Sequence, residues 1–127
     1  MTAEDRLSDL FWALSHPYRR VILYYLREHE TATLDTLTEC VTGWAESAPG
    51  ATAGARPADD ERVRVQLHHA HLPMLADTGF LTYDADTGEV TRRDLLPPTE
   101  SVLSAAATVD AGNGELDVDA LVVSSGK

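Results

Sequence analysis

The stretch that decides the fold is VRVQLHHAHLPMLADTGFLTYD, residues 63–84, which continues into ADTG at 85–88 and EVTRR at 89–93. Its first part spaces apolar residues as a helix does, and we predict a helix over about 59–77. Turn-forming residues then separate two short β-prone runs, which predicts a hairpin over about 80–93. A long helix that leads directly into a hairpin is typical of the second half of a winged helix-turn-helix, with the hairpin as the wing.

The upstream sequence predicts the front half of such a domain. A helix over 5–15 is indicated by four apolar residues spaced i, i+3, i+4 and i+7, namely Leu7, Leu10, Phe11 and Leu14. Pro17 ends that helix and suits the first turn of a second one, which extends to about residue 29. The β-prone residues 31–33 predict a small edge strand or an extended link, and a third helix follows over 34–45.

Two segments of the chain break the helical pattern. Residues 47–58, SAPGATAGARPA, predict a flexible loop, because glycine, proline and small residues interrupt a helix. Beyond the hairpin, we expect Thr99 to cap a short alanine-rich helix within 96–108. For 109–127 we expect a flexible acidic tail, with a short edge strand through 120–123 as the alternative.

These elements together predict one mainly α domain with a small β-hairpin (α+β class) over 1–95. It is a winged helix-turn-helix with a three-helix core, an N-terminal helix and a wing, followed by the short C-terminal helix. The 127 residues, 43% of them apolar, suffice for one compact core. No apolar run reaches the ~18 residues that span a bilayer, so we expect a cytoplasmic protein without a membrane partner. The single cysteine, Cys40, excludes an intramolecular disulfide and is expected to be a small buried residue.

The charge of the chain is strongly acidic. Its 21 Asp and Glu residues outnumber 10 Lys and Arg residues, which gives a formal net charge of −11. Lys127 is the only lysine, and the overall pattern resembles the bias of proteins from extreme halophiles. At ~1 M salt the Debye length is only ~3 Å, so the net charge says more about the solvent than about the partner. The alternative is an ordinary acidic protein that avoids DNA.

The predicted helix over 59–77 has a polar sector near its start, formed by Arg62, Gln66 and His69. On a helical wheel this sector lies between two apolar sides, so we expect the helix to be wedged between other elements. Arginine pairs well with guanine, glutamine with adenine, and histidine can donate to a base or a phosphate. The three are therefore candidate DNA-binding residues on the part of a recognition helix that enters the major groove. The alternative is an ordinary solvated face.

The wing carries the paired cations Arg92 and Arg93. A wing commonly lays basic side chains along the phosphate backbone, which makes both arginines candidate DNA-binding residues. Alternatively, they pair with acids of the same hairpin, at Asp84, Asp86 or Glu89, and such surface pairs contribute little stability.

Pro73 stands inside the predicted helix. It removes one backbone hydrogen bond and should kink the helix after His69, unless the freed carbonyl finds another donor, for which His71 is a candidate. We expect His68, on an apolar side, to be a hydrogen-bonded core histidine rather than a metal ligand, since zinc sites need four ligands in recognisable pairs.

Two segments resemble a known family. ALSHPYRRVIL at 13–23 resembles the motif AL-x-(D/H)-P-x-R-R-x-I-L that opens ArsR-like winged-helix repressors, and HLPMLADTGFL at 71–81 resembles the end of their recognition helix. The chain is most similar to an uncharacterised winged-helix domain family of halophilic archaea. This resemblance covers about 5–94 and implies a dimeric, sequence-specific DNA-binding regulator, with Gln66 and His69 at groove-contact positions.

The remaining motif residues and the apolar helices suggest how the domain is held together. We expect Arg19 and Arg20 to stabilise the fold through pairs with acids rather than to touch bases. We expect the N-terminal helix and the helix after Pro98 to form the interface of a homodimer, through Leu7, Leu10, Phe11, Leu14, Val102 and Leu103.

No motif predicts catalysis, since the glycines of 50–54 lack a following Lys-Ser/Thr and no serine lies in a nucleophile elbow. We therefore expect no enzyme activity, no cofactor, no metal and no identifiable small-molecule effector. The expected partners are double-stranded DNA and a second copy of the chain.

Two functions remain open: a DNA-binding transcriptional regulator, or a winged-helix protein-interaction module that does not bind DNA. The regulator requires Arg62, Gln66, His69 and the wing arginines on a continuous acid-free face, whereas the module tolerates the acids of 59–61 beside it.

Overall fold

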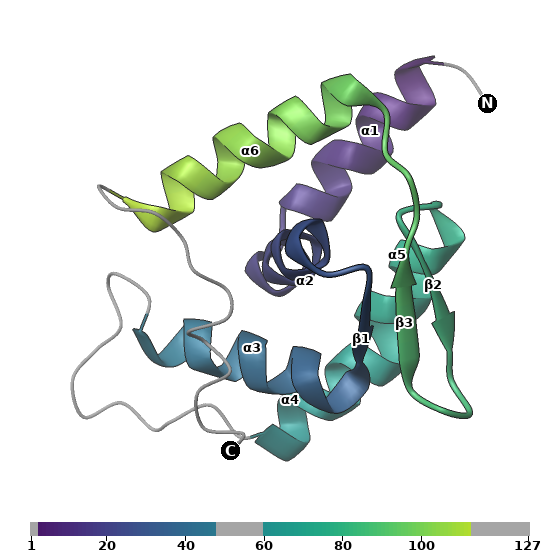
Figure 1. Ribbon diagram of the computed structural model, residues 1–127, viewed down its shortest axis with the longest axis vertical. Helices are drawn as coiled ribbons and strands as arrows, with labels where there is room; N and C mark the ends of the chain where they lie inside the picture. The colour runs from purple at the N-terminus through teal and green to yellow at the C-terminus, as the bar shows by residue number, and fades with distance from the viewer. Residues whose placement is uncertain (1–2, 48–59, 113–127) are drawn as a thin grey trace.

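The computed structural model describes residues 3–47 and 60–112. Of the loop expected over 47–58, Ser47 is instead the last residue of a helix, and the rest lies outside this part, as does the tail beyond residue 112. The elements in chain order are α1 (Ala3–Leu14), α2 (Pro17–Glu28), β1 (Thr31–Thr33), α3 (Leu34–Ser47), α4 (Asp60–Gln66), the π-helical turn η1 (Leu67–His71), α5 (Leu72–Asp77), β2 (Leu81–Asp84), β3 (Glu89–Arg92) and α6 (Pro97–Ala111). The described chain is thus mainly helical with a small sheet, as predicted (Figure 1).

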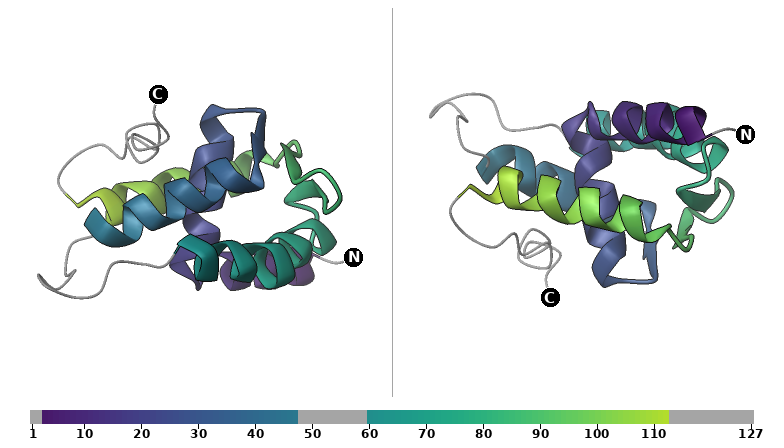
Figure 2. Two further views of the ribbon diagram at one scale, coloured as in Figure 1. Left: turned by 90° about the horizontal axis from the view of Figure 1, so that it is seen from below. Right: turned by 90° about the horizontal axis from the view of Figure 1, so that it is seen from above.

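The helices form two groups with α2 between them. Figure 1 shows α1 and α6 at one end of the molecule and α3 and α4 at the other, and the views from below and above in Figure 2 agree. The core between them is filled by fully buried side chains from all the layers, among them Ile22, Tyr24, Leu37, Leu67, Leu72, Leu81, Val90 and Leu103. Cys40 is also fully buried and free, as expected. No helix in the described ranges is long and apolar enough to cross a bilayer.

The three strands form one antiparallel sheet in the order β1-β3-β2. Residues 31–33 are therefore an edge strand, one of the two predicted alternatives, with Ala32 opposite Val90. The hairpin of β2 and β3 pairs Tyr83 with the same Val90. At its tip, Gly88 has φ +79, a conformation that favours glycine, and its carbonyl accepts a hydrogen bond from Leu34 N–H at 2.8 Å. The tip of the hairpin is thereby attached to the start of α3.

The predicted long helix is divided by Pro73. Pro73 has no N–H, so a regular helix would lose one backbone hydrogen bond here. The helix instead takes up one extra residue in the turn η1, where Leu72 N–H donates to Leu67 O, five positions earlier. The extra residue rotates the helix faces, so that one side, formed by Val63, Leu67, His71, Leu72 and Leu75, is buried. Val65 and Met74 are each 46% exposed, so the predicted helix with two buried apolar sides is wrong.

Arg19 and Arg20 hold the helices together in different ways. Arg20 pairs with Asp110 of α6 at 2.8 Å, and Tyr24 OH donates to the same carboxylate at 2.6 Å. The expected pairing with an acid is confirmed there. It is wrong for Arg19, which donates to the carbonyl of Trp12 at 2.6 Å and to Ser15 Oγ at 2.9 Å, because this guanidinium lies at the open carbonyl end of α1.

The C-terminal helix is longer than predicted at both ends. Pro97, at the first position of α6, begins the helix after Leu96, so Thr99 lies inside the helix and is not its cap. At the other end α6 extends to Ala111, and residues 109–111, expected in the tail, are helical. The bonds of Asp110 to Arg20 and Tyr24 explain why the last turn is retained. The expected strand over 120–123 lies outside the described residues.

Candidate functional site

The outer face of α4 and η1 presents the predicted polar sector to solvent. Arg62, Gln66 and His69 are all exposed, while Val63 and Leu67 anchor the opposite side in the core. The buried anchors fix the helix, so the three polar groups project from a rigid element. Together they offer one guanidinium, one carboxamide and one imidazole, which are hydrogen-bonding groups able to read base edges.

An ion pair holds α4 against α3. Arg64 Nε lies 2.8 Å from Asp35 Oδ1 in the first turn of α3, and this hydrogen bond raises the pKa of Arg64 above its usual value. Both groups are solvent-accessible, so the pair contributes little to stability. Its effect is that Arg64, the one cationic side chain between Arg62 and Gln66 in the sequence, is already paired with Asp35. Sequence reasoning missed this pair, because nothing in the sequence relates two residues separated by 29 positions.

A second contact ties the helix to the hairpin. His68 Nδ1 and Tyr83 OH share a hydrogen bond of 2.6 Å, and burial raises the pKa of Tyr83. The expectation of a hydrogen-bonded His68 is confirmed, although the side chain is half-buried rather than in the core. This bond fixes the orientation of β2 relative to η1.

The two arginines of the hairpin, Arg92 and Arg93, lie at the opposite end of the hairpin from its tip. Arg92 pairs with Leu81 at the hairpin base, and its Nη1 donates to the carbonyls of Leu26 at 3.3 Å and Arg27 at 3.1 Å, at the end of α2. Arg93 N–H donates to Phe80 O, also at the base. The hairpin tip is attached to α3, and four strand residues at ~3.3 Å each separate it from the base. The structure therefore does not bring Arg92 and Arg93 onto the face that carries Arg62.

The surroundings of the exposed helix face are acidic. Asp60 and Glu61 lie in the first turn of α4, where the helix dipole favours them. The exposed residues of the hairpin tip include three acids, Asp84, Asp86 and Glu89. The face is thus not free of acids, and the continuous acid-free face that a DNA-binding regulator was expected to require is not present.

A buried cluster of rings joins the two segments that resemble the repressor family. Arg19 Nη1 donates to His71 Nδ1 at 3.3 Å, and the rings of His16 and His71 are 4.5 Å apart. Since a guanidinium can only donate, His71 Nδ1 accepts and the ring is neutral. Burial, helped by the nearby His16 and Arg19, lowers the pKa of His71 to about 4. His71 is therefore bound to Arg19 at the π-helical turn, and does not serve as the donor suggested for the carbonyl freed by Pro73.

The expected dimer residues differ in how accessible they are. Leu10 and Leu103 belong to the core of the single chain, and Leu14 is half-buried against it. Leu7 is 51% exposed, Phe11 60% and Val102 36%. Leu7, Leu96 and Val102 line one shallow pocket between α1 and the start of α6, and the exposed Phe11 lies one helical turn from Leu7 on α1. We refer to Leu7, Phe11, Leu96 and Val102 as the α1–α6 surface. Leu10 and Leu103 are thus placed in the core rather than on that surface.

Within the described ranges, no cluster of three or more His, Cys, Asp or Glu side chains is arranged to hold a metal ion. His68 and His71 bind different partners, Tyr83 and Arg19, and the ring of His69 makes an edge contact with that of His68 at 4.7 Å.

The fold and the site define a mainly helical α+β domain that carries an exposed polar helix face between α3 and a β-hairpin. The chain belongs to the family described as Domain of unknown function (DUF7344), which matches residues 11–91. The match begins within α1, ends within β3 and includes both His16 and His71. No curated protein and no solved structure matches the chain.

Proposed function

We propose that the domain is a winged helix-turn-helix and a sequence-specific DNA-binding regulator of transcription. In this proposal α3 is the first helix of the helix-turn-helix, α4, η1 and α5 form the recognition helix, and the hairpin of β2 and β3 is the wing. The observation that carries it is the exposure of Arg62, Gln66 and His69 on a helix whose other side is anchored in the core. A rigid helix with readable side chains near its start is what major-groove recognition requires.

The proposed DNA contact is restricted to the recognition helix. Arg92 is engaged by the end of α2, and the hairpin tip is acidic, so the wing supplies no basic clamp. Affinity then depends on base readout more than on phosphate contacts, and the acids of α4 are tolerated only when salt screens them. At ~1 M salt the Debye length of ~3 Å confines repulsion to close contacts. We therefore propose that the protein binds DNA at high salt, and the binding measurement is made under that condition.

We expect Arg62→Ala to weaken binding to the specific duplex about tenfold or more, since a good arginine–guanine pair is worth ~1–3 kcal/mol. Arg93→Ala is the matched control, because it removes the same charge from the hairpin base and should change the Kd by less than about twofold. Fluorescence anisotropy in molar KCl, with duplexes from the gene's own upstream region and a scrambled duplex, measures both. Circular dichroism verifies that each variant is folded.

Equal, negligible binding of every duplex by the folded wild-type protein would contradict the proposal. It would favour the second candidate, a protein-interaction module. The exposure of Val65 and Met74 on the outer side of the helix, together with the neighbouring Asp60 and Glu61, favours that function. Equal losses from Arg62→Ala and Arg93→Ala would instead indicate non-specific phosphate binding.

We also propose that the protein is a homodimer joined through the α1–α6 surface, since exposed apolar side chains that are contiguous mark an interaction site. Phe11→Asp is expected to convert the dimer to a monomer, because it introduces a charge at the most exposed of these side chains. Val65→Asp, on α4 at the opposite end of the molecule from α1 and α6 (Figure 1), should leave the mass unchanged. Size-exclusion chromatography with light scattering measures both, and a monomeric wild-type protein would refute the dimer.

A further inference from the structure

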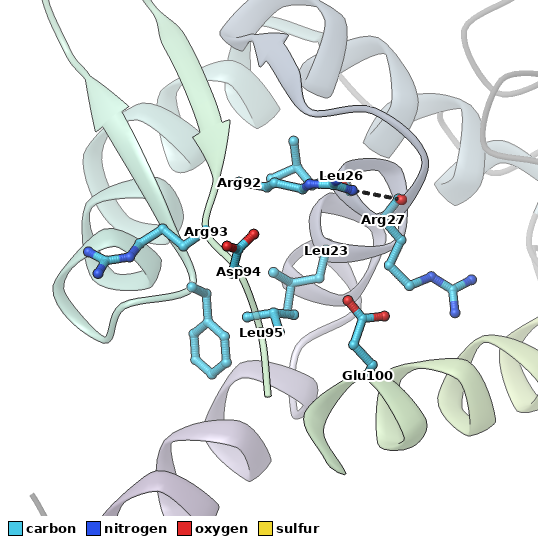
Figure 3. A pocket seen from close by; sticks show the side chains of 9 residues that line it. Leu23, Leu26, Arg27, Arg92, Arg93, Asp94, Leu95 and Glu100 are labelled. Carbon is cyan, nitrogen blue, oxygen red and sulfur yellow. Dashed lines mark hydrogen bonds between the residues drawn. The ribbon is translucent and has the colours of Figure 1, made fainter. Parts of the chain in front are cut away.

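A cavity of about 200 Å³ lies at the base of the hairpin, where α2 ends and α6 begins (Figure 3). Its floor is apolar and consists of the buried Leu23, Leu26 and Phe80 and the half-buried Leu95. The volume is below the ~300–1,000 Å³ typical of sites for drug-sized ligands, so it suits a smaller molecule.

The rim of this cavity has charged groups of both signs. Figure 3 shows the carboxylates of Asp94 and Glu100 directed into the cavity, whereas the Arg93 side chain extends away from it. The Nε of Arg27 is buried and has no hydrogen-bond partner among the described residues. The Arg27 guanidinium lies 5.8 Å from the Tyr24 ring, which holds it in place without satisfying its donors. A buried donor without an acceptor is costly, and a bound acceptor would remove that cost.

We propose that this cavity binds a small zwitterion with an ammonium group, a carboxylate group and an apolar side chain, as in a free amino acid. The ammonium group would be bound by Asp94 and Glu100, and the carboxylate by Arg27 Nε. The apolar part would cover Leu23 and its neighbours. A simple cation would leave the Arg27 donor unsatisfied, and a simple anion would face two carboxylates, so only a ligand with both charges complements the rim.

The site is distinct from the exposed face of α4, and the binding inference does not depend on DNA recognition. L-leucine is the probe, because its side chain matches the leucine-rich floor. Isothermal titration of the wild-type protein should show saturable binding of L-leucine. Isopentylamine, which lacks the carboxylate, and 4-methylpentanoate, which lacks the ammonium group, should each bind at least about tenfold more weakly, because each leaves one sign of charge on the rim without its partner. Equal affinity for L-leucine and isopentylamine would overturn the zwitterion in favour of a cation site.

Two substitutions test the acidic and the basic groups of the rim separately. Glu100→Gln should weaken L-leucine and isopentylamine but not 4-methylpentanoate, and Arg27→Met should weaken L-leucine and 4-methylpentanoate but not isopentylamine. Glu89→Gln at the hairpin tip and Arg64→Met on α4 are matched controls outside the cavity and should leave all affinities unchanged. Asp94→Asn provides a second carboxylate variant if Glu100→Gln does not fold. Absence of saturable L-leucine binding, or binding that the rim variants leave unchanged, would refute the proposal.

Discussion

Replacing Arg19 by methionine is expected to lower the free energy of unfolding by ~3–4 kcal/mol, because hydrogen bonds from charged donors are worth ~1.5–3 kcal/mol and their acceptors become orphaned. Arg19 is only 8% exposed and donates to two carbonyls at the end of α1, to Ser15 Oγ and to His71 Nδ1. Its Cζ also lies 4.0 Å from the centroid of the Trp12 ring. Methionine retains much of the apolar stem and none of these bonds.

Urea denaturation followed by circular dichroism measures this loss, with an unchanged m-value as evidence that the same surface is exposed. Arg93→Met is the matched control, since Arg93 is exposed and the change should stay within ~0.5 kcal/mol. Arg19→Lys should also be clearly destabilising, because a single ammonium cannot reach acceptors spread around a planar guanidinium. A loss below ~1 kcal/mol for Arg19→Met would mean that the cost of burying the charged guanidinium offsets the stability gained from its hydrogen bonds.

Acidification is expected to destabilise the domain through His71. The pKa of this ring is about 4 in the folded chain and 6.5 in the unfolded chain, so the unfolded state binds the proton first as the pH falls. The stability that the neutral ring contributes is complete above pH 6.5 and is lost as the pH falls through about 4. Since a tenfold difference in proton affinity is worth about 1.4 kcal/mol, the full loss is ~3 kcal/mol. Burial likewise lowers the pKa of His16, which adds to the effect in the same direction.

His71→Gln removes the titrating ring and keeps a hydrogen-bond acceptor for Arg19. Between pH 7.5 and pH 4, the wild-type protein should lose ~3 kcal/mol more than this variant, because other groups titrate in both proteins alike. His69→Gln, at an exposed position of the same helical turn, is the control and should follow the wild type. Unfolding free energies at several pH values measure the difference. Parallel pH profiles for wild type and His71→Gln would show that His71 is not the acid-sensitive group.

The sequence predicted the elements whose signals are local. Three of these signals act within a few positions: the helical spacing of apolar residues in α1, the proline at the start of α2 and the turn residues of the hairpin. All three elements are present. The exposure of Arg62 and Gln66 also followed from periodicity, since α4 is a regular helix up to Gln66, and His69 in η1 is exposed as well. The widening at η1 was missed, although Pro73 signalled a disturbance, because a kink and a π-helical turn are equally local responses to the missing N–H.

Contacts between distant segments had no sequence signal. Arg92 was grouped with the polar helix face because it is basic and belongs to the hairpin, and the structure instead binds it to carbonyls of α2, 65 and 66 positions away. Leu10 and Leu103 were expected on a surface because apolar spacing cannot tell a core contact from a contact with another chain. The cavity at Arg27 likewise forms only where α2, the base of the hairpin and α6 meet, and the sequence of none of these segments by itself indicates a cavity.

The amino-acid sequence by itself thus determined the order of the helices and of the hairpin and the exposure of the polar side of α4, because these depend on backbone propensity and on the period of apolar residues. Only the tertiary structure decided which polar groups meet. It bound Arg19 to His71, 52 positions away, and Tyr24 to Asp110, and it bound Arg92 to the carbonyls at the end of α2. The physical reason is that a buried polar group needs a hydrogen-bond partner. Which group becomes that partner depends on how the helices pack in space, and not on the distance along the chain.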